Sequence, residues 1–345
     1  MVDQSYYIGV DGGGTHCRVQ LEDEQGNVLS CAEAGSANIM TNAAVAMQSI
    51  INASEKAISA ISKPTSAIGK PISAIGKPIS AVDKHGSATG EREESAIKLN
   101  QIHLAAGLAG ANIPSALNEF LRLPHPFKSV TVISDLHAAC LGAHNGQPGA
   151  LIICGTGSAA TVFTGSSTRT NSHQFNDKGG YGLSISDNAS GGWLGLEAVK
   201  HCLLVFDELI PQSLLFISVC DSLAVTNAHE LVTKVAGFKG KEFGALAPSV
   251  VAAYEKGCPA AKVLIQQGAS YLNAVGETLT CKTIVDKTSN EKAFNNQDLP
   301  LCLVGGLSHV YQPLISADLQ ARLIEPKSSP QVGVIQYVKQ QAALA

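Results

Sequence analysis

Residues 11–15 read DGGGT and stand between two apolar runs, Tyr6–Val10 and Cys17–Leu21. This pattern predicts a β-hairpin with a glycine-rich loop, followed by a third strand at Val28–Cys31. Three consecutive glycines let the backbone bend tightly and present several N–H groups to one anion. Since a hairpin turn seldom needs three glycines, we interpret the stretch as a phosphate loop. Asp11, at the strand end, is the residue type that holds water on Mg²⁺.

A second loop of this kind, GTGS at residues 155–158, lies between the apolar runs Leu151–Cys154 and Ala159–Thr164. Two glycine hairpins that face one another can clamp one polyphosphate. The first loop has neither the GK[ST] ending of a Walker A motif nor the G-x-G-x-x-G of a dinucleotide-binding fold. A strand–glycine turn–strand unit therefore opens each half of the chain, which predicts an architecture duplicated within an α/β protein.

Asp135 follows the predicted strand Val130–Ile133. An acid at the carboxyl end of a strand points into the cleft of an α/β domain. Capping of the next helix, by Ser134 or Asp135, explains the position equally well.

Two further stretches can likewise be interpreted either as part of a binding site or as local structure at the start of a helix. Residues 186–195, SDNASGGWLG, open a helix, and Asp187 or Ser190 could cap it. The glycines of residues 304–306, VGG, follow the buried strand Leu301–Val304. They let a flat ring such as adenine approach closely, or they form a helix-entry turn.

The composition limits the classes of function. The 345 residues are enough for about two domains. Only 15% of residues are charged, against roughly 25% in an average globular domain, and the net charge is −4. Without a basic patch, nucleic acid and anionic membranes are poor partners. Neither a signal peptide nor a transmembrane span is expected. Nine scattered cysteines without a CxxC pair indicate reduced thiols in the cytoplasm.

Helical spacing is clearest at Ala43–Ile61. A tandem repeat with a period of seven residues then follows at residues 59–84, and because Pro recurs in three of its units we reject a coiled coil. The segment is interpreted as a low-complexity surface insert. The remaining predicted elements are a strand at Ile102–Ala106 and helices at Ile113–Leu121, Leu136–Ala143, Leu194–Val205, much of 222–280 and Gly333–Ala345. No chemistry is expected of His16, His103, His137 or His144, whose spacing fits no metal site.

The order of the motifs is specific. After DGGGT come GLAG at residues 107–110, Asp135, GTGS, GGYG at residues 179–182, SDNAS at residues 186–190 and GG at residues 305–306. This order resembles the BadF/BadG/BcrA/BcrD ATPase family and, within it, the N-acetylglucosamine and glucosamine kinases. Residues 35–40, 139–144 and 185–187 are also similar to glucosamine kinases, and the likeness covers nearly the whole chain outside residues 59–95.

The resemblance implies the actin/hexokinase/Hsp70-like ATPase fold, an α/β fold of two RNase H-like domains around a cleft. The N-terminal domain would span residues 1–130 and carry the insert at 59–95. The C-terminal domain would span residues 131–328, and a helix at residues 329–345 would pack back on the N-terminal domain.

The resemblance also implies phosphorylation of an amino sugar at its 6-hydroxyl by ATP with Mg²⁺, in the cytoplasm, and it allows a homodimer. Asp135 would be the catalytic base, and Asp11 would hold the metal through water. Phosphate contacts would come from Gly12, Gly13, Gly14, Thr15, Gly155, Thr156, Gly157 and Ser158. Adenosine would lie near Gly305 and Gly306, and the sugar near Asn38, Asp135, Gly179, Gly180, Tyr181 and Asp187.

Two departures from the N-acetylglucosamine kinases favour glucosamine as the substrate. Many of those enzymes carry D-E-G-S where this chain has DNAS at residues 187–190, and they often carry Trp where Tyr181 stands. An activator-type ATPase of the same family, coupled to a partner enzyme, is the alternative function. A regulator without catalysis is a further alternative, but it would need a basic helix-turn-helix segment, and the strand at Tyr6 leaves no room for one at the N-terminus.

Overall fold

The computed structural model describes residues 5–61, 97–167, 172–279 and 299–344. In the N-terminal half it contains β1 Tyr6–Gly12, β2 Cys17–Glu22, β3 Val28–Ala34, α1 Ala43–Ile61, β4 Ile102–Leu108, α2 Pro114–Leu121, β5 Ser129–Ser134 and α3 Asp135–Ala143. The remainder contains β6 Gly149–Cys154, β7 Ser158–Ser167, β8 Ser172–Gly179, α4 Gly191–Phe206, α5 Leu214–Leu223, α6 Ala228–Val235, α7 Gly240–Gly244, α8 Ala247–Glu255, α9 Pro259–Leu279, β9 Leu301–Val304, α10 Ser308–Tyr311, α11 Ala317–Ala321 and α12 Pro330–Leu344.

The two sheets repeat one topology. The first has the order β3-β2-β1-β4-β5, with β1–β2 and β2–β3 antiparallel and β1–β4 and β4–β5 parallel. The second has the order β8-β7-β6-β9, in which β6–β7 and β7–β8 are antiparallel and β6–β9 is parallel. The predicted duplication is therefore confirmed, and the chain has the actin/hexokinase/Hsp70-like ATPase fold.

The expected domain boundary and the repeat insert can both be located on the elements of the structure. The expected domain boundary at residues 130 and 131 falls inside β5, and the whole of β5 pairs with β4 in the first sheet. Residues 59–61 of the repeat insert form the last turn of α1, and the rest of the insert lies outside the described residues.

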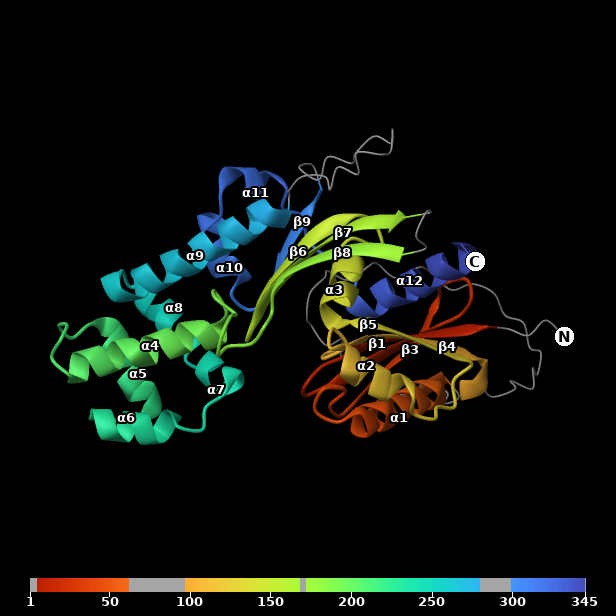
Figure 1. The fold of residues 1–345 in the computed structure, drawn as a ribbon, viewed down its shortest axis with the longest axis horizontal. Coiled ribbons are helices and arrows are strands. Elements are labelled where there is room, and N and C mark those ends of the chain that lie inside the picture. The colour runs from red at the N-terminus through yellow and green to blue at the C-terminus, as the bar shows by residue number, and fades with distance from the viewer. Residues whose placement is uncertain (1–4, 62–96, 168–171, 280–298, 345) are drawn as a thin grey trace, which may run out of the picture.

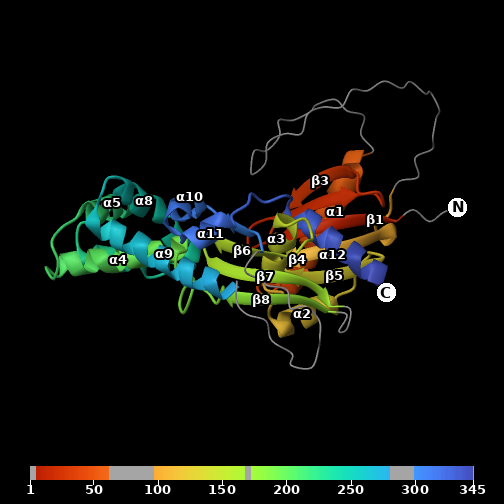
Figure 2. The same ribbon diagram turned by 90° about the horizontal axis from the view of Figure 1, so that it is seen from above.

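Helices cover both faces of the first sheet, with α1 and α2 on one face and α3 and α12 on the other (Figure 1). In α1 the buried side chains recur every three or four residues, which is the stripe that an amphipathic helix presents to a sheet. They are Ala43, Ala46, Met47, Ser49, Ile50, Ala53, Ser54 and Ala57. Helices α4, α5 and α8 gather at the end of the molecule farthest from the first sheet, and α9 runs from there toward the second sheet (Figure 2).

Helix α3 packs on both sheets. Its Cys140, Leu141 and Ala143 share an apolar cluster with Leu151 of β6 and Phe163 of β7. On another side of the helix, Ala138 packs with Ala105 of β4 and with Val334 and Ile335 of α12. The helix that begins at Asp135 thus contacts both sheets.

Glycines allow α12 to lie against its neighbours at backbone distance. A Cβ atom placed on Gly9 of β1 would lie closer than 3.0 Å to the carbonyl of Gln331. A Cβ on Gly142 of α3 would meet Ser329, and one on Gly333 would meet the backbone of Gly142, each closer than 3.0 Å. Close-packed interiors do not absorb an extra methyl group without movement, so these glycines fix where α12 crosses α3 and β1.

A buried charge also holds α12. Glu22 of β2 is 5% exposed, and its carboxylate lies 3.6 Å from the ammonium of Lys339. The same ammonium lies 4.6 Å from the ring centroid of Tyr7 on β1, within the range of a cation–π interaction. The C-terminal helix is therefore bound to the first sheet by charge as well as by packing. None of the helices in the described ranges is long and apolar enough to cross a bilayer.

We expect Gly333→Ala to lower the free energy of unfolding by about 1–3 kcal/mol, because the added methyl group overpacks the crossing with α3. The gain in helix propensity, about 1 kcal/mol, would offset only part of this cost. Urea unfolding followed by circular dichroism measures the difference. Gly237→Ala is the matched control, since a Cβ there meets nothing within 4 Å. Equal stability of the two variants would contradict the packing described for α12.

Candidate active site

The first glycine loop connects β1 and β2 and is held from behind. The carbonyl of Gly12 accepts a hydrogen bond from the Ala109 amide (2.8 Å), and that of Gly13 accepts one from the Ala37 amide (2.9 Å). At the tip, a Cβ placed on Gly14 would meet nothing within 4 Å, and Thr15 is exposed. The loop therefore has a fixed base and an accessible tip, as a phosphate-binding loop requires.

The second glycine loop connects β6 and β7 and is anchored to the start of α4. The amide of Gly191 donates to Gly155 (2.7 Å), and that of Gly192 donates to Thr156 (3.0 Å). The hydroxyl of Ser158 donates to the carbonyl of Asn188 (2.7 Å), so it is directed into the protein. Phosphate contacts by this loop would therefore come from its main chain and from the exposed Thr156.

The Gly305-Gly306 turn lies directly on the second loop. Gly305 has a φ of 108°, and a Cβ there would lie closer than 3.0 Å to Cys154, the last residue of β6. The backbone of the turn can approach β6 only because this residue is glycine. The next residue, Gly306, is open on its outer side, since a Cβ there would meet nothing within 4 Å.

Parallel pairing brings Asp11 and Asp135 to the same edge of the first sheet. Asp11 pairs with Gly107 of β4, Gly107 pairs with Ile133 of β5, and Asp135 begins the helix after β5. Burial raises the pKa of Asp11, the Arg18 guanidinium at 3.8 Å lowers it in part, and the charge of Asp135 raises it again. Asp135 thus contributes to the electrostatic environment of Asp11, after burial and Arg18.

Asp135 is not the residue that caps helix α3. The cap of α3 is Ser134, whose hydroxyl oxygen accepts a hydrogen bond from the His137 amide (3.1 Å). Asp135 accepts one hydrogen bond from the Leu136 amide (2.9 Å) and keeps contact with solvent. Although it is accessible, the protein around it desolvates the carboxylate and raises its pKa, an effect that these hydrogen bonds and His137 only reduce. A carboxylate with a raised pKa suits a general base.

Asp187 is likewise free of the capping role. The cap of α4 is Ser190, which accepts a hydrogen bond from the Trp193 amide (3.0 Å). Asp187 is 8% exposed, has a left-handed φ of 61° and accepts a hydrogen bond from Gly182 (3.2 Å). A Cβ on Gly157 would lie 2.9 Å from its other carboxylate oxygen. Asp187 therefore connects the loop of residues 179–187 with the second glycine loop, and burial raises its pKa.

Asn38 lies beside the first loop and the GLAG segment. Its side-chain oxygen accepts hydrogen bonds from the amides of Met40 (3.0 Å) and Thr41 (3.3 Å). With the oxygen used in this turn, the NH₂ group is the part of the side chain that can donate to a ligand.

The predicted residues form two groups, one on each sheet. Asp11, Gly12, Gly13, Gly14, Thr15, Asn38 and Asp135 surround the ends of β1, β4 and β5. Gly155, Thr156, Gly157, Ser158, Gly179, Gly180, Tyr181, Asp187, Gly305 and Gly306 surround the ends of β6, β8 and β9. Within the described part of the chain, no hydrogen bond or ion pair joins a member of one group to a member of the other.

Sequence reasoning missed two residues at the site. Arg18 is the cross-strand partner of Asp11, which the hairpin register alone could have revealed. Tyr271 of α9 hydrogen-bonds Ser186, and a Cβ on Gly179 would lie 2.9 Å from its hydroxyl. Gly179 has a φ of 69°, so two constraints require glycine there. No local motif marks Tyr271, because only packing of α9 brings it to this loop.

The carboxylates fit Mg²⁺ bound mainly by water and phosphate. Among the described residues, no group of three or more His, Cys, Asp and Glu side chains is placed to hold a metal ion. Mg²⁺ in phosphoryl-transfer sites is commonly held by one or two carboxylates together with waters and substrate phosphates. Asp11, next to the first loop, matches that requirement.

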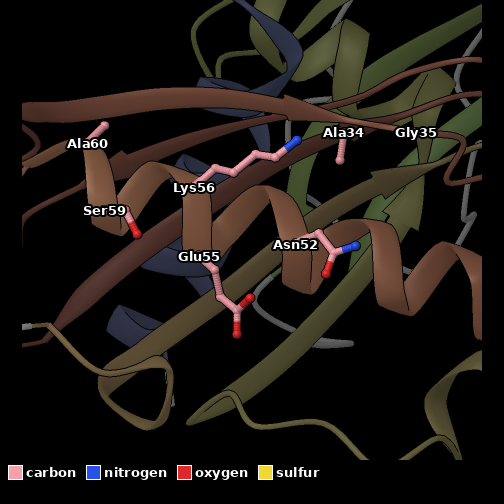
Figure 3. Close-up of a pocket in the computed structure, with 7 residues that line it drawn as sticks. All are labelled: Ala34, Gly35, Asn52, Glu55, Lys56, Ser59 and Ala60. Atoms are coloured by element: carbon pink, nitrogen blue, oxygen red, sulfur yellow. The ribbon is translucent and has the colours of Figure 1, made fainter.

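A surface hollow of about 580 Å³ lies elsewhere, between the end of β3 and α1 (Figure 3). Its walls include Gly35, Asn52 and Glu55, and the Lys56 ammonium beside them donates to the Glu33 carbonyl (3.1 Å). None of the predicted site residues lines it.

Known proteins resemble this chain over most of its length. Residues 8–333 match the sequence profile of the BadF/BadG/BcrA/BcrD ATPase family. Glucosamine kinase GspK of Vibrio cholerae is 28% identical over 336 residues, covering 96% of this chain and 95% of that protein. The N-acetylmuramic acid/N-acetylglucosamine kinase of Clostridium acetobutylicum is 26% identical over 209 residues, covering 59% of this chain and 63% of that protein.

A solved structure has a similar fold. A protein of Chromobacterium violaceum, whose assignment as an N-acetylglucosamine kinase is provisional, superposes with a TM-score of 0.74 at 24% identity. The superposition covers 97% of this chain and 99% of that one.

We expect Asp135→Asn to leave the protein at least as stable as the wild type at neutral pH. Burial raises the folded-state pKa of Asp135. At pH values above that pKa, the ionised carboxylate lowers the stability of the fold. At pH values below the unfolded-state pKa of about 3.9, the carboxyl group is protonated in both states and has no such effect. Any stability gained by the variant should therefore shrink as the pH is lowered toward about 4. Urea unfolding at several pH values measures it.

Asp23→Asn provides a control of opposite sign. Hydrogen bonds from Asn27 lower the pKa of Asp23, so its ionised form stabilises the fold. This variant should gain no stability at neutral pH. A marked loss of stability in Asp135→Asn alone would contradict the electrostatics described for the site.

Proposed function

This chain belongs to the BadF/BadG/BcrA/BcrD ATPase family, and we propose that it is an ATP-dependent sugar kinase that phosphorylates an amino sugar at its 6-hydroxyl. The observation that carries the proposal is the placement of Asp135. It stands at the carboxyl end of β5, relieved of capping by Ser134, beside the first glycine loop and with a raised pKa. A hydroxyl acceptor requires such a base.

Phosphoryl transfer depends mainly on positioning and on charge neutralisation. The main chains of residues 12–15 and 155–158 would bind the phosphates of ATP, and Gly305-Gly306 would contact adenosine beside the second loop. Asp135 would accept the proton of the attacking hydroxyl. Mg²⁺, when bound, supplies charge neutralisation on the phosphate oxygens, and Asp11 is the residue that would hold it through water.

The sugar would be held between the two groups of site residues. Asn38 would donate from its amide, and Asp187 would accept from sugar hydroxyls while the backbone of Gly180 and Tyr181 forms the wall. Asp187 and Asp135 both have raised pKa values because of desolvation, so an ammonium group nearby would favour their ionised forms. Of the two amino sugars this supports glucosamine, which agrees with the glucosamine kinase of Vibrio cholerae being 28% identical.

The burial of two cysteines weighs against the activator-type alternative. An iron–sulfur cluster shared between subunits needs thiolates at a surface. Cys140 and Cys154 are both fully buried, and burial raises the pKa of each thiol to about 12. Neither thiol is therefore available to bridge two subunits.

The sugar is identified by ADP release in a coupled assay with Mg-ATP and glucosamine, N-acetylglucosamine, glucose or no sugar. We expect strong turnover with one amino sugar, glucosamine first, and little without sugar, because the acceptor hydroxyl must lie in line with the γ-phosphorus. ATP hydrolysis that none of the sugars changes would contradict the proposal and favour the activator-type ATPase.

Replacement of the base tests the mechanism. Asp135→Asn should lower kcat for sugar phosphorylation by about 10²–10⁴-fold, the contribution of a positioned general base. The acid limb of the wild-type kcat profile should lie above the ordinary aspartate range of about 3.9, since the pKa of Asp135 is raised. Asp23→Asn, in the turn after β2, should leave kcat unchanged. Near-normal turnover in Asp135→Asn would refute this role.

A further inference from the structure

A contact between a histidine and a carboxylate side chain joins the helix that carries the base to the second sheet. Nε2 of His137, in the first turn of α3, lies 2.9 Å from both carboxylate oxygens of Asp177 on β8. The two residues are 40 positions apart in the sequence. The contact lies outside both groups of site residues, and neither the fold nor the proposed chemistry explains it.

The surroundings fix both partners. The Thr161 hydroxyl of β7 donates to Asp177 (2.6 Å), so one carboxylate receives hydrogen bonds from two elements. The His137 ring stacks on Phe175, with centroids 3.9 Å apart and an interplanar angle of 8°, and Phe175 stacks on Phe163. A ring held on one face by an aromatic side chain and at one edge by a carboxylate has little freedom of orientation.

The position of this contact along the chain is informative. His137 comes two residues after Asp135, and its backbone amide donates to Ser134, the cap of α3. Asp177 comes two residues before Gly179, where β8 ends and the loop leading to Tyr181 and Asp187 begins. The contact therefore joins the helix turn that holds the base to the strand that leads into the sugar loop.

The charge of Asp177 favours a persistent contact. Partial burial would raise its pKa, but the hydrogen bonds from His137 and Thr161 and the charge of Lys178 outweigh burial and lower it. Asp177 is thus an ionised acceptor at neutral pH. The pair is partly exposed, with side-chain exposures of 22% for His137 and 42% for Asp177. Ion pairs this exposed contribute little to the free energy of unfolding, so we expect its removal to leave the fold intact.

We propose that the His137–Asp177 pair is a positioning device that sets Asp135 relative to the sugar loop. This inference rests on the proposed function. In this proposal the pair acts by fixing the first turn of α3 against β8 and not by contact with ATP or sugar. A displacement of about 1 Å at a reacting group can cost on the order of 10²-fold in rate. Loss of the pair should therefore reduce the rate of the chemical step rather than the binding of ATP.

The test uses the full chain with His137→Ala, Asp177→Ala and the double variant. Each single variant should lower kcat for sugar phosphorylation by roughly 10- to 100-fold, with KM for ATP within about twofold of the wild type. The double variant should lose little more than either single variant, because both changes remove one contact. His137→Gln, which keeps an N–H donor near the position of Nε2, should recover part of the rate lost in His137→Ala.

His103→Ala is the matched control. His103 is also half-buried and hydrogen-bonded, to Ser129 at 2.7 Å, and it stacks on Tyr7, but all of these contacts lie within the first sheet. His103→Ala should change the free energy of unfolding at least as much as His137→Ala does, while kcat stays near the wild-type value. Equal losses of kcat in the two variants would show that any lost histidine packing slows the enzyme, and would overturn the inference.

The remaining outcomes separate the inference from the function on which it rests. If the wild type phosphorylates an amino sugar and the His137 and Asp177 variants do so at full rate, the positioning role is wrong and the proposed function stands. If the wild type transfers phosphate to no sugar, the proposed function is wrong. In that case the rate of ATP hydrolysis without sugar is measured for the three variants. A double variant that loses little more of this rate than either single variant supports the positioning of Asp135, whereas full-rate hydrolysis in all three variants overturns it.

Discussion

The site depends on the packing of α3 against both sheets. Ala138 lies against Gly107 so closely that a Cβ on that glycine would come within 3.0 Å of it, and Gly142 meets the backbone of Gly333 in α12. On its other side, Leu141 and Cys140 pack with β6 and β7. Because Asp135 is the first residue of this helix, the position of the proposed base is set by contacts with both halves of the molecule. Parallel pairing of β1, β4 and β5 then places Asp11 and the first glycine loop in front of it.

The electrostatics of the site work against the stability of the fold. Burial raises the pKa values of Asp11, Asp135 and Asp187, so each ionised carboxylate is disfavoured in the folded protein. Ser134 and Ser190, rather than Asp135 and Asp187, cap helices α3 and α4. A sugar kinase can use this arrangement, since a base with a raised pKa and carboxylates facing an ammonium group or Mg²⁺ are favoured once ligands are bound.

Most of the elements that build the sheets could be predicted from the sequence. Helix α1 and strand β9 have the bounds that their spacing predicts, since apolar periodicity and flanking polar residues mark both ends. Strand β8 was missed, because SHQFNDKG has little apolar alternation and the strand lies at a sheet edge. The glycine loops were visible as local patterns. The sequence left capping and catalysis undecided for Asp135 and Asp187, and the side-chain geometry of Ser134 and Ser190 distinguishes them. Tyr271 and the His137–Asp177 pair depend on packing between distant segments, so no local signal could reveal them.

The central claim is that the two glycine loops and Asp135 form a site for phosphoryl transfer to a sugar hydroxyl. Phosphorus NMR of the protein incubated with Mg-ATP and glucosamine tests this most directly, since it distinguishes transfer from hydrolysis. The account predicts ADP together with a phosphomonoester signal coupled to the protons of carbon 6, with little inorganic phosphate. Inorganic phosphate as the sole product beside ADP, with each of the amino sugars, would contradict it.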